Sequence, residues 1–223
     1  MRRRTLGALT APLTLGLTTI LPPVDSQASA RTGGVVIGGR PVSVADVPWM
    51  VAIASRDRFG GTRSGQFCGG AVVGRSTVLT AAHCLSRETL GVPLEDVHDV
   101  KVIVGRDDLG TGEGREIPVR AAVLDPSYDR RTHAWDVAAL TLSSPLPASA
   151  VLPRAAQGDA AYEPGTKAVV YGWGDITGAG DYRSELRAAD LQVLPDATCR
   201  RAYPGSAEGT YLAASMLCAG TSE

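Results

Sequence analysis

Residues 79–84 read Leu-Thr-Ala-Ala-His-Cys, and residues 67–70, shortly before them, read Phe-Cys-Gly-Gly. Both stretches lie among short apolar runs bounded by turn residues, a pattern typical of β-strands. The sequence therefore places His83 between a β-rich segment and a cysteine, Cys84, that could lock it in position. In an exported protein this arrangement indicates acid or base chemistry.

The N-terminal residues predict export. Arg2-Arg3-Arg4 is followed by an apolar run from Leu6 to Leu21, by Pro22-Pro23 and by the small residues 28–30. This order is typical of a cleavable secretory signal, which we place at residues 1–30. The alternative is a membrane anchor, but the run contains Gly, Pro and four Thr and is shorter than the roughly 20 apolar residues of a span. We expect a secreted, extracellular protein with no membrane contact after signal cleavage.

Size, charge and cysteine content narrow the class of protein. Removal of the signal leaves roughly 190 residues, enough for one large domain or two small ones. The formal net charge of −1 provides no positive surface for nucleic acid or anionic lipid. Four cysteines are an even number, as a disulfide framework in an oxidising compartment requires, and they allow three pairings.

Short apolar runs recur along the chain and predict an all-β barrel or sandwich. Six candidate strands precede residue 143, at residues 47–54, 68–73, 77–80, 100–104, 116–124 and 137–142. Residues 143–164, rich in Pro and Ala, predict a linker between two parts of the fold. Beyond it we expect strands at residues 166–173 and 188–194, and a short helix with Asp196 as its N-cap that carries Cys199.

A carboxylate opens the sixth of these runs. Residues 133–140 read His-Ala-Trp-Asp-Val-Ala-Ala-Leu, so Asp136 directly precedes apolar residues and could be fixed in a low-dielectric setting. An aspartate before a strand is commonly only a turn residue. Its place after His83, and the run Pro126-Ser127-Tyr128 upstream of it, favour a functional role instead.

Together these stretches resemble the chymotrypsin/trypsin family of secreted serine proteases. The resemblance implies that His83 is the general base and then the general acid, and that Asp136 holds the imidazole in one tautomer and stabilises the imidazolium. It implies a double six-stranded antiparallel β-barrel, with the first barrel at residues 36–145, a linker at 146–165 and a second barrel at 166–223. It also implies the disulfides Cys68–Cys84 and Cys199–Cys218, each worth about 3 kcal/mol by the chain-entropy estimate.

Other motifs extend the resemblance over nearly all of residues 36–220. Val36-Ile37-Gly38-Gly39 is similar to the new N-terminus of the activated family, which implies a propeptide at residues 31–35. Gly172-Trp173-Gly174 resembles a turn of the family's second barrel, and residues 216–220 resemble the strand end that leads to the specificity pocket. One departure is Val35, which stands where the family usually has Arg or Lys before the activating cleavage.

The second departure is the nucleophile. The sequence ends at residues 218–223, Cys-Ala-Gly-Thr-Ser-Glu, before any Gly-Asp-Ser-Gly-Gly loop. Ser64 and Ser76 lack the Gly-Asp-Ser-Gly surroundings that would let either replace it. We therefore expect an incomplete second barrel and a serine endopeptidase by family that is inactive as given. The alternative is a non-catalytic secreted protease homologue that acts as a binding module.

We expect no cofactor and no metal. Adjacent residues make a poor chelate, which disfavours a zinc site at His83 and Cys84. A calcium site at Asp107, Asp108 and Glu113 would lack an EF-hand spacing. His98 and His133 are expected to be exposed loop residues. The expected partners are peptide or protein substrates, with no nucleic acid, and we expect a monomer.

Overall fold

The computed structural model describes residues 39–180, 182–206 and 209–221. The chain divides into two units, residues 1–31 and residues 32–223, and every described residue belongs to the second unit. The expected signal peptide at 1–30, the propeptide at 31–35 and Val36, Ile37 and Gly38 of the expected activated N-terminus lie outside the described residues. Among the residues described, no helix is long and apolar enough to span a membrane.

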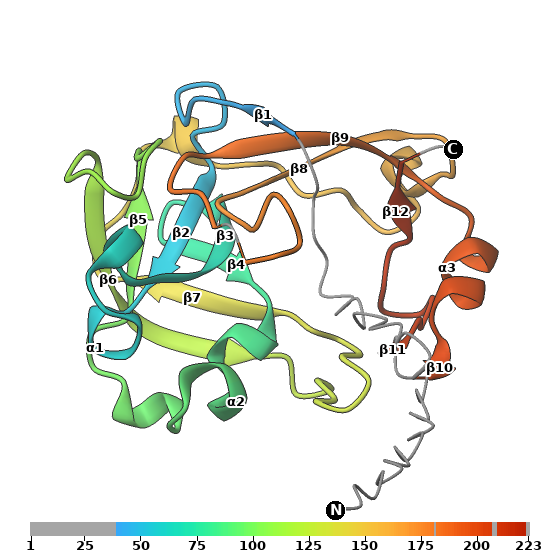
Figure 1. The fold of residues 1–223 in the computed structure, drawn as a ribbon, viewed down its shortest axis with the longest axis horizontal. Coiled ribbons are helices and arrows are strands. Elements are labelled where there is room, and N and C mark those ends of the chain that lie inside the picture. The colour runs from blue at the N-terminus through green and yellow to red at the C-terminus, as the bar shows by residue number, and fades with distance from the viewer. Residues whose placement is uncertain (1–38, 181, 207–208, 222–223) are drawn as a thin grey trace, which may run out of the picture. The chain divides into compact units, whose positions relative to one another are not determined.

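Six antiparallel strands form a closed barrel, in the order β2-β3-β4-β7-β6-β5 (Figure 1). The strands are β2 (Met50–Ala54), β3 (Gln66–Gly74), β4 (Thr77–Thr80), β5 (Lys101–Val104), β6 (Arg115–Leu124) and β7 (Ala138–Leu142). Closure leaves no edge strand whose backbone groups would lack partners. The six strands predicted before residue 143 are confirmed, with ends that differ by up to three residues.

Buried and partly exposed residues alternate along strands that have one face in the barrel core. Along β7, Ala138, Leu140 and Leu142 are buried in the barrel core, while the residues between them are partly exposed. β2 differs because all five of its residues are buried. Val51 and Ile53 point into the barrel core, whereas its other face packs in a second cluster with Trp173 and Leu186. A strand that is covered on both faces has a continuous apolar sequence rather than an alternating one.

The second cluster joins the barrel to a four-stranded sheet (Figure 1). β9 (Arg187–Val193) pairs with β8 (Lys167–Gly172), with β1 (Arg40–Pro41) and with β12 (Ala219–Gly220), always antiparallel. This confirms the two strands predicted after the linker. Within the described residues this sheet is not closed, and β10 (Pro204–Ser206) pairs separately with β11 (Gly209–Thr210).

Gly39, the last residue of the expected activated N-terminus, sits where only glycine fits. Its φ is +69°, and a Cβ built on it would lie 2.8 Å from the carbonyl oxygen of Ala188. Any side chain would therefore push the segment off β9, where Arg40 pairs with Ala188. The glycine allows the chain after residue 38 to join the sheet through β1.

The expected helix near Cys199 is present as α3 (Asp196–Ala202), but the prediction of Asp196 as its N-cap is wrong. Pro195 occupies the N-cap position with an extended backbone, and Asp196 is the first helical residue. Its carboxylate accepts a hydrogen bond from the Tyr211 hydroxyl at 2.7 Å instead of capping the backbone. The acidic group still lies at the helix N-terminus, where the backbone dipole favours negative charge.

Short helical segments connect the strands. The α-helices α1 (Arg56–Phe59) and α2 (Arg87–Leu90) are capped by the hydroxyls of Ser55 and Ser86. The 3-10 turns cover Thr62–Gly65, Ala82–Leu85, Leu94–Asp96, Ala148–Ala150 and Ala160–Tyr162. The last two turns lie in the predicted linker, which otherwise has no strand or helix.

Candidate active site

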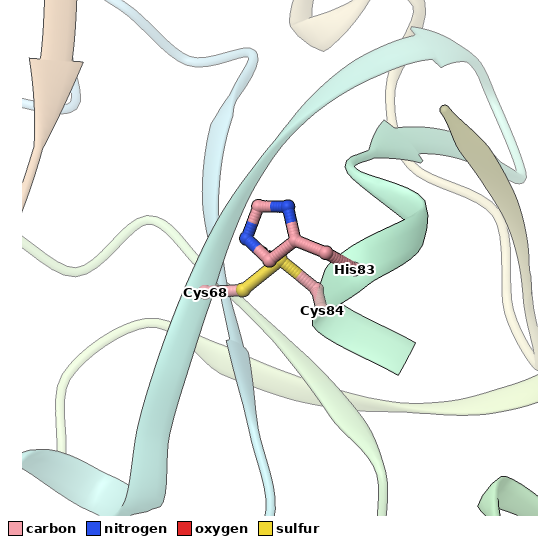
Figure 2. A group of neighbouring side chains, drawn as sticks. All are labelled: Cys68, His83 and Cys84. Carbon is pink, nitrogen blue, oxygen red and sulfur yellow. A yellow bond between two sulfur atoms is a disulfide. The ribbon is translucent and has the colours of Figure 1, made fainter. Parts of the chain in front are cut away.

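His83 lies on the 3-10 turn that follows β4. The neighbouring residues Ala82, Cys84 and Leu85 are buried, so the turn is anchored in the barrel core. Cys84 forms a disulfide with Cys68 of β3, and Figure 2 shows the imidazole of His83 beside this bond. The backbone at His83 is therefore fixed by a covalent link and by packing, while the ring remains on the surface.

A further contact holds the turn from its other side. The Thr89 hydroxyl of α2 donates a hydrogen bond to the carbonyl oxygen of His83 at 2.7 Å. The N-cap Ser86 of the same helix accepts from the backbone N–H of Thr89. The capped helix thereby fixes the carbonyl of His83 as well as its own first turn.

Asp136 binds His83 twice. Its Oδ2 lies 2.6 Å from His83 Nδ1, and its Oδ1 accepts from the backbone N–H of His83 at 2.8 Å. The hydrogen bond to a carboxylate favours the tautomer with the proton on Nδ1, which leaves a lone pair on Nε2. The Asp136 side chain is 21% exposed and that of His83 is 45% exposed. A partly buried carboxylate therefore orients an accessible base.

The loop between β6 and β7 places Asp136. Its two ends are joined because the backbone N–H of Asp125 donates to the carbonyl oxygen of Val137 at 3.0 Å. Tyr128 packs from this loop against the barrel core. Burial, followed by the negative charge of Asp136, raises the pKa of the Tyr128 phenol, so this group stays neutral at neutral pH. The carboxylate at the start of β7 thus has a fixed, partly apolar surrounding.

His133 lies at the same site, which the sequence analysis did not anticipate. Its side chain is 57% exposed, as expected for a loop residue, but its Nδ1 lies 3.9 Å from Asp136 Oδ2. Its ring centroid is 5.9 Å from that of His83. The spacing of three residues between His133 and Asp136 was the available signal. The loop has a positive φ at both His133 and Trp135, and this backbone conformation brings the His133 side chain close to Asp136.

Side chains of the two disfavoured metal sites have other partners in the structure. At His83, the sulfurs of Cys68 and Cys84 are bonded to each other and supply no thiolate. In the loop after β5, Asp107 accepts from Ser43 and the backbone of Val44, and Asp108 accepts from the backbone of Gly110.

A buried arginine fills the centre of that same loop. Arg106 is 3% exposed, and its guanidinium donates to the carbonyl oxygen of Glu113, to the carboxylate of Glu116 and to the hydroxyl of Ser64. Ser64 is itself 5% exposed and donates to the carbonyl oxygen of Leu109 at 2.8 Å. The hydroxyl of Ser64 therefore has a structural role. Ser76, the other serine compared with the family nucleophile, lies in the tight turn between β3 and β4.

The chain is similar in sequence and in fold to known proteins. The family model "Trypsin" matches residues 36–223. A trypsin of Saccharopolyspora erythraea is 33% identical over 188 residues, covering 84% of this chain and 74% of the relative. Human kallikrein-14 is 29% identical over 228 residues, covering 99% of this chain and 78% of the relative. Among solved structures, neuropsin, a serine protease expressed in the limbic system of mouse brain, is similar with a TM-score of 0.66 at 26% identity, over 84% of this chain and 75% of that chain.

Proposed function

Because this chain belongs to the trypsin family of serine proteases, we propose that it supplies the base and the orienting carboxylate of a serine endopeptidase. The observation that carries the proposal is the pair of hydrogen bonds from His83 to Asp136, at 2.6 and 2.8 Å. His83 Nε2 takes the proton of a serine hydroxyl as that oxygen attacks a peptide carbonyl. The same proton then passes to the leaving amine.

Asp136 has two functions in this step. It keeps the Nδ1 proton in place, so that the lone pair stays on Nε2, and it stabilises the positive ring that forms when Nε2 is protonated. The two-point attachment also prevents the ring from turning away. No metal or organic cofactor enters this chemistry, and the substrates are peptides or proteins.

We propose that no serine of residues 1–223 is the nucleophile, because none of them has Gly-Asp-Ser-Gly surroundings. The polypeptide of residues 1–223 on its own is then without measurable peptidase activity. Removal of the serine from such a triad lowers turnover roughly a millionfold. Residues 36–145 are the first barrel, 146–165 the linker and 166–223 part of a second barrel.

The proposal includes the route by which the protein is made. A signal at residues 1–30 exports the chain, the two disulfides Cys68–Cys84 and Cys199–Cys218 form in an oxidising compartment, and cleavage before Val36 creates the mature N-terminus. The mature protein acts outside the cell as a monomer. The second candidate, a non-catalytic binding module, has less support, because a binding surface does not need a carboxylate that fixes one imidazole tautomer.

The test uses a chimera. The C-terminal segment of the Saccharopolyspora erythraea trypsin that carries its nucleophile loop is joined after Gly220, and hydrolysis of peptide esters and amides is measured. We expect turnover by the chimera, loss of that turnover with His83→Ala, and no turnover by residues 1–223 alone. His98→Ala, which changes an exposed histidine outside the site, is the matched control and should leave turnover intact.

Two results would contradict the proposal. A chimera that contains both disulfides, as shown by mass spectrometry of non-reduced digests, and is nevertheless inactive would favour the binding module. Turnover by residues 1–223 that disappears with His83→Ala would show that a nucleophile exists within these residues.

A further inference from the structure

The Cys68–Cys84 disulfide has an ionisable side chain beside one of its sulfurs. His83 Nε2 lies 3.7 Å from Cys84 Sγ, and Figure 2 shows the ring next to the sulfur–sulfur bond. The other nitrogen of the same ring is hydrogen-bonded to Asp136 Oδ2 at 2.6 Å. From this series of contacts we propose that Cys68–Cys84 is a reversible thiol-exchange site, at which His83 stabilises the sulfur of Cys84 as the leaving thiolate.

The two sulfurs of this disulfide are not equivalent. Cys84 is 3% exposed and lies in the anchored 3-10 turn, whereas Cys68 on β3 is only partly buried against the barrel core. Thiol exchange depends on access to the attacked sulfur and on how well the leaving sulfur carries a negative charge. An external thiolate therefore attacks Cys68, and Cys84 is the leaving group.

The reagent is a low-molecular-weight thiol of the glutathione class, which reacts as its thiolate. Its sulfur forms a bond with Cys68 Sγ while the bond between the two cysteine sulfurs breaks, and the bonding electron pair stays on Cys84 Sγ. A second thiolate can then attack the sulfur of the bound reagent, form a disulfide with it and release Cys68 as a thiolate. The cysteine pair gains two electrons in total, and the two reagent thiols are oxidised to their disulfide.

His83 stabilises the reduced form of the pair. The proton released by the reagent thiol reaches Nε2 through solvent, so that an imidazolium lies next to the Cys84 thiolate. Asp136 balances the positive ring, as it does in the proposed reaction with serine. Cysteines beside a positively charged histidine ionise more readily than free cysteine, and a disulfide whose reduced form is stabilised is more easily reduced. The Cys68–Cys84 bond should therefore be labile.

The second disulfide provides an internal reference. Cys199–Cys218 connects α3 to the residue before β12, and Cys218 is 1% exposed. In the part of the chain that the structure describes, no histidine nitrogen contacts either of these sulfurs. Cys199–Cys218 should therefore resist reduction as an ordinary structural disulfide does.

Exchange at Cys68 would switch off the base. A proton on Nε2 that is paired with the Cys84 thiolate leaves no lone pair to accept a proton from a serine. The turn also loses its covalent anchor, although the hydrogen bonds from Thr89 and to Asp136 remain. This loss of activity rests on the proposed function, but the exchange itself does not.

The test measures both disulfides in the same molecule. The full chain, with both disulfides formed, is equilibrated with mixtures of reduced and oxidised glutathione, free thiols are alkylated, and digests are quantified by mass spectrometry. We expect the equilibrium constant for reduction to be at least about tenfold larger for Cys68–Cys84 than for Cys199–Cys218, which corresponds to about 30 mV. The glutathione adduct should be found on Cys68 and not on Cys84.

Variants of two histidines separate the effect of the imidazolium from other causes. His83→Ala and His83→Gln remove the group that becomes a cation, and each should make Cys68–Cys84 about tenfold harder to reduce, again about 30 mV. Cys199–Cys218 should not change in either variant. His133→Asn, which tolerates the positive φ of this position and retains His83, is the matched control and should leave both equilibria unchanged.

Three results would overturn the exchange site: a Cys68–Cys84 bond no more reducible than Cys199–Cys218, equilibria that both His83 variants leave unchanged, or an adduct on Cys84. Because this measurement needs no turnover, its result can be interpreted even if the endopeptidase proposal fails. In the active chimera, hydrolysis that is lost with the Cys68 adduct and returns on reoxidation would support the regulatory role. Hydrolysis that persists in the adduct would overturn that role alone.

Discussion

At the scale of single residues, the Asp136 carboxylate has the largest effect on the chemistry of the site. It accepts both the Nδ1–H and the backbone N–H of His83, so one side chain fixes the ring and the turn that carries it. The sequence pointed to the two residues by different routes: His83 lies in a long motif that resembles the family, whereas Asp136 was favoured by its place after His83 and by residues 126–128 upstream of it. It missed His133, whose approach depends on the unusual backbone of an exposed loop.

Asp136→Asn tests this control of the tautomer. The amide can donate to Nδ1, so we expect the ring proton of His83 to move partly to Nε2, which nitrogen-15 NMR of the imidazole can measure. In the active chimera, turnover should fall about ten-thousand-fold, the loss that trypsin-family enzymes themselves show for the equivalent change. His133→Asn, which retains the His83–Asp136 pair, should not change the tautomer. A His83 ring that stays protonated on Nδ1 in Asp136→Asn would contradict the role given to Asp136.

At the scale of elements, β5 and β6 are tied to α1 by charged side chains around Glu116. The bidentate hydrogen bond from Arg56, at 2.6 Å to each oxygen, is the main cause that lowers the pKa of Glu116 from 4.5 to about 2. Burial opposes this shift, and the buried Arg106 adds to it. The burial of Arg106 beside Glu116 could not be predicted from the sequence, because Arg106 lies in a Gly-Arg-Asp-Asp turn that predicts an exposed loop.

Glu116 predicts how stability depends on pH. Its folded pKa is below its ordinary value, so the contribution is fully present above pH 4.5 and is lost as pH falls towards 2. The difference in free energy of unfolding between the wild type and Glu116→Gln should therefore shrink over this window. Urea denaturation at a series of pH values measures it. Glu88→Gln, which removes an exposed pair with Arg130, is the control and should change stability little. A difference that is constant with pH would rule out the low pKa.

The strands themselves could be predicted because short apolar runs with turn residues between them are sufficient evidence for a barrel. The pairing of the cysteines came only with the family resemblance, because four cysteines allow three pairings. The N-cap prediction for α3 was wrong because it rested on the residue type of Asp196 alone, whereas Pro195 has the extended backbone of the cap position and Asp196 is already helical.

At the scale of the whole molecule, Trp173 links the barrel to the sheet of β8 and β9. It is 3% exposed, packs in the second cluster, and its indole N–H donates to the carbonyl oxygen of Asp107 at 3.0 Å. Trp173→Ala should lower the free energy of unfolding by about 3 to 5 kcal/mol. Trp173→Phe should cost less, on the order of 1 kcal/mol for one lost hydrogen bond, because the Asp107 carbonyl oxygen still accepts from the backbone N–H of Leu186 at 2.8 Å. Trp135→Phe, at an exposed position, should change stability little.

Equal stability of the wild type and Trp173→Ala in chemical denaturation would show that the two parts are joined by other contacts. The same experiment has a second readout, because a weakened junction should let the sheet unfold at a lower denaturant concentration than the barrel. Separate transitions by hydrogen exchange would then be seen in the Trp173→Ala variant and not in the wild type.

The double burial of β2 has a consequence for dividing or recombining this protein. A fragment that ends at the linker would keep the barrel strands but would expose Met50, Ala52 and Ala54 to solvent. No polar residue of β2 lies on this face to reduce its apolar character. Such a fragment should self-associate. The boundary between the two parts of the molecule therefore does not coincide with the proline-rich linker, because the side chains of β2 belong to both hydrophobic clusters. Neither part can be exchanged without redesigning β2.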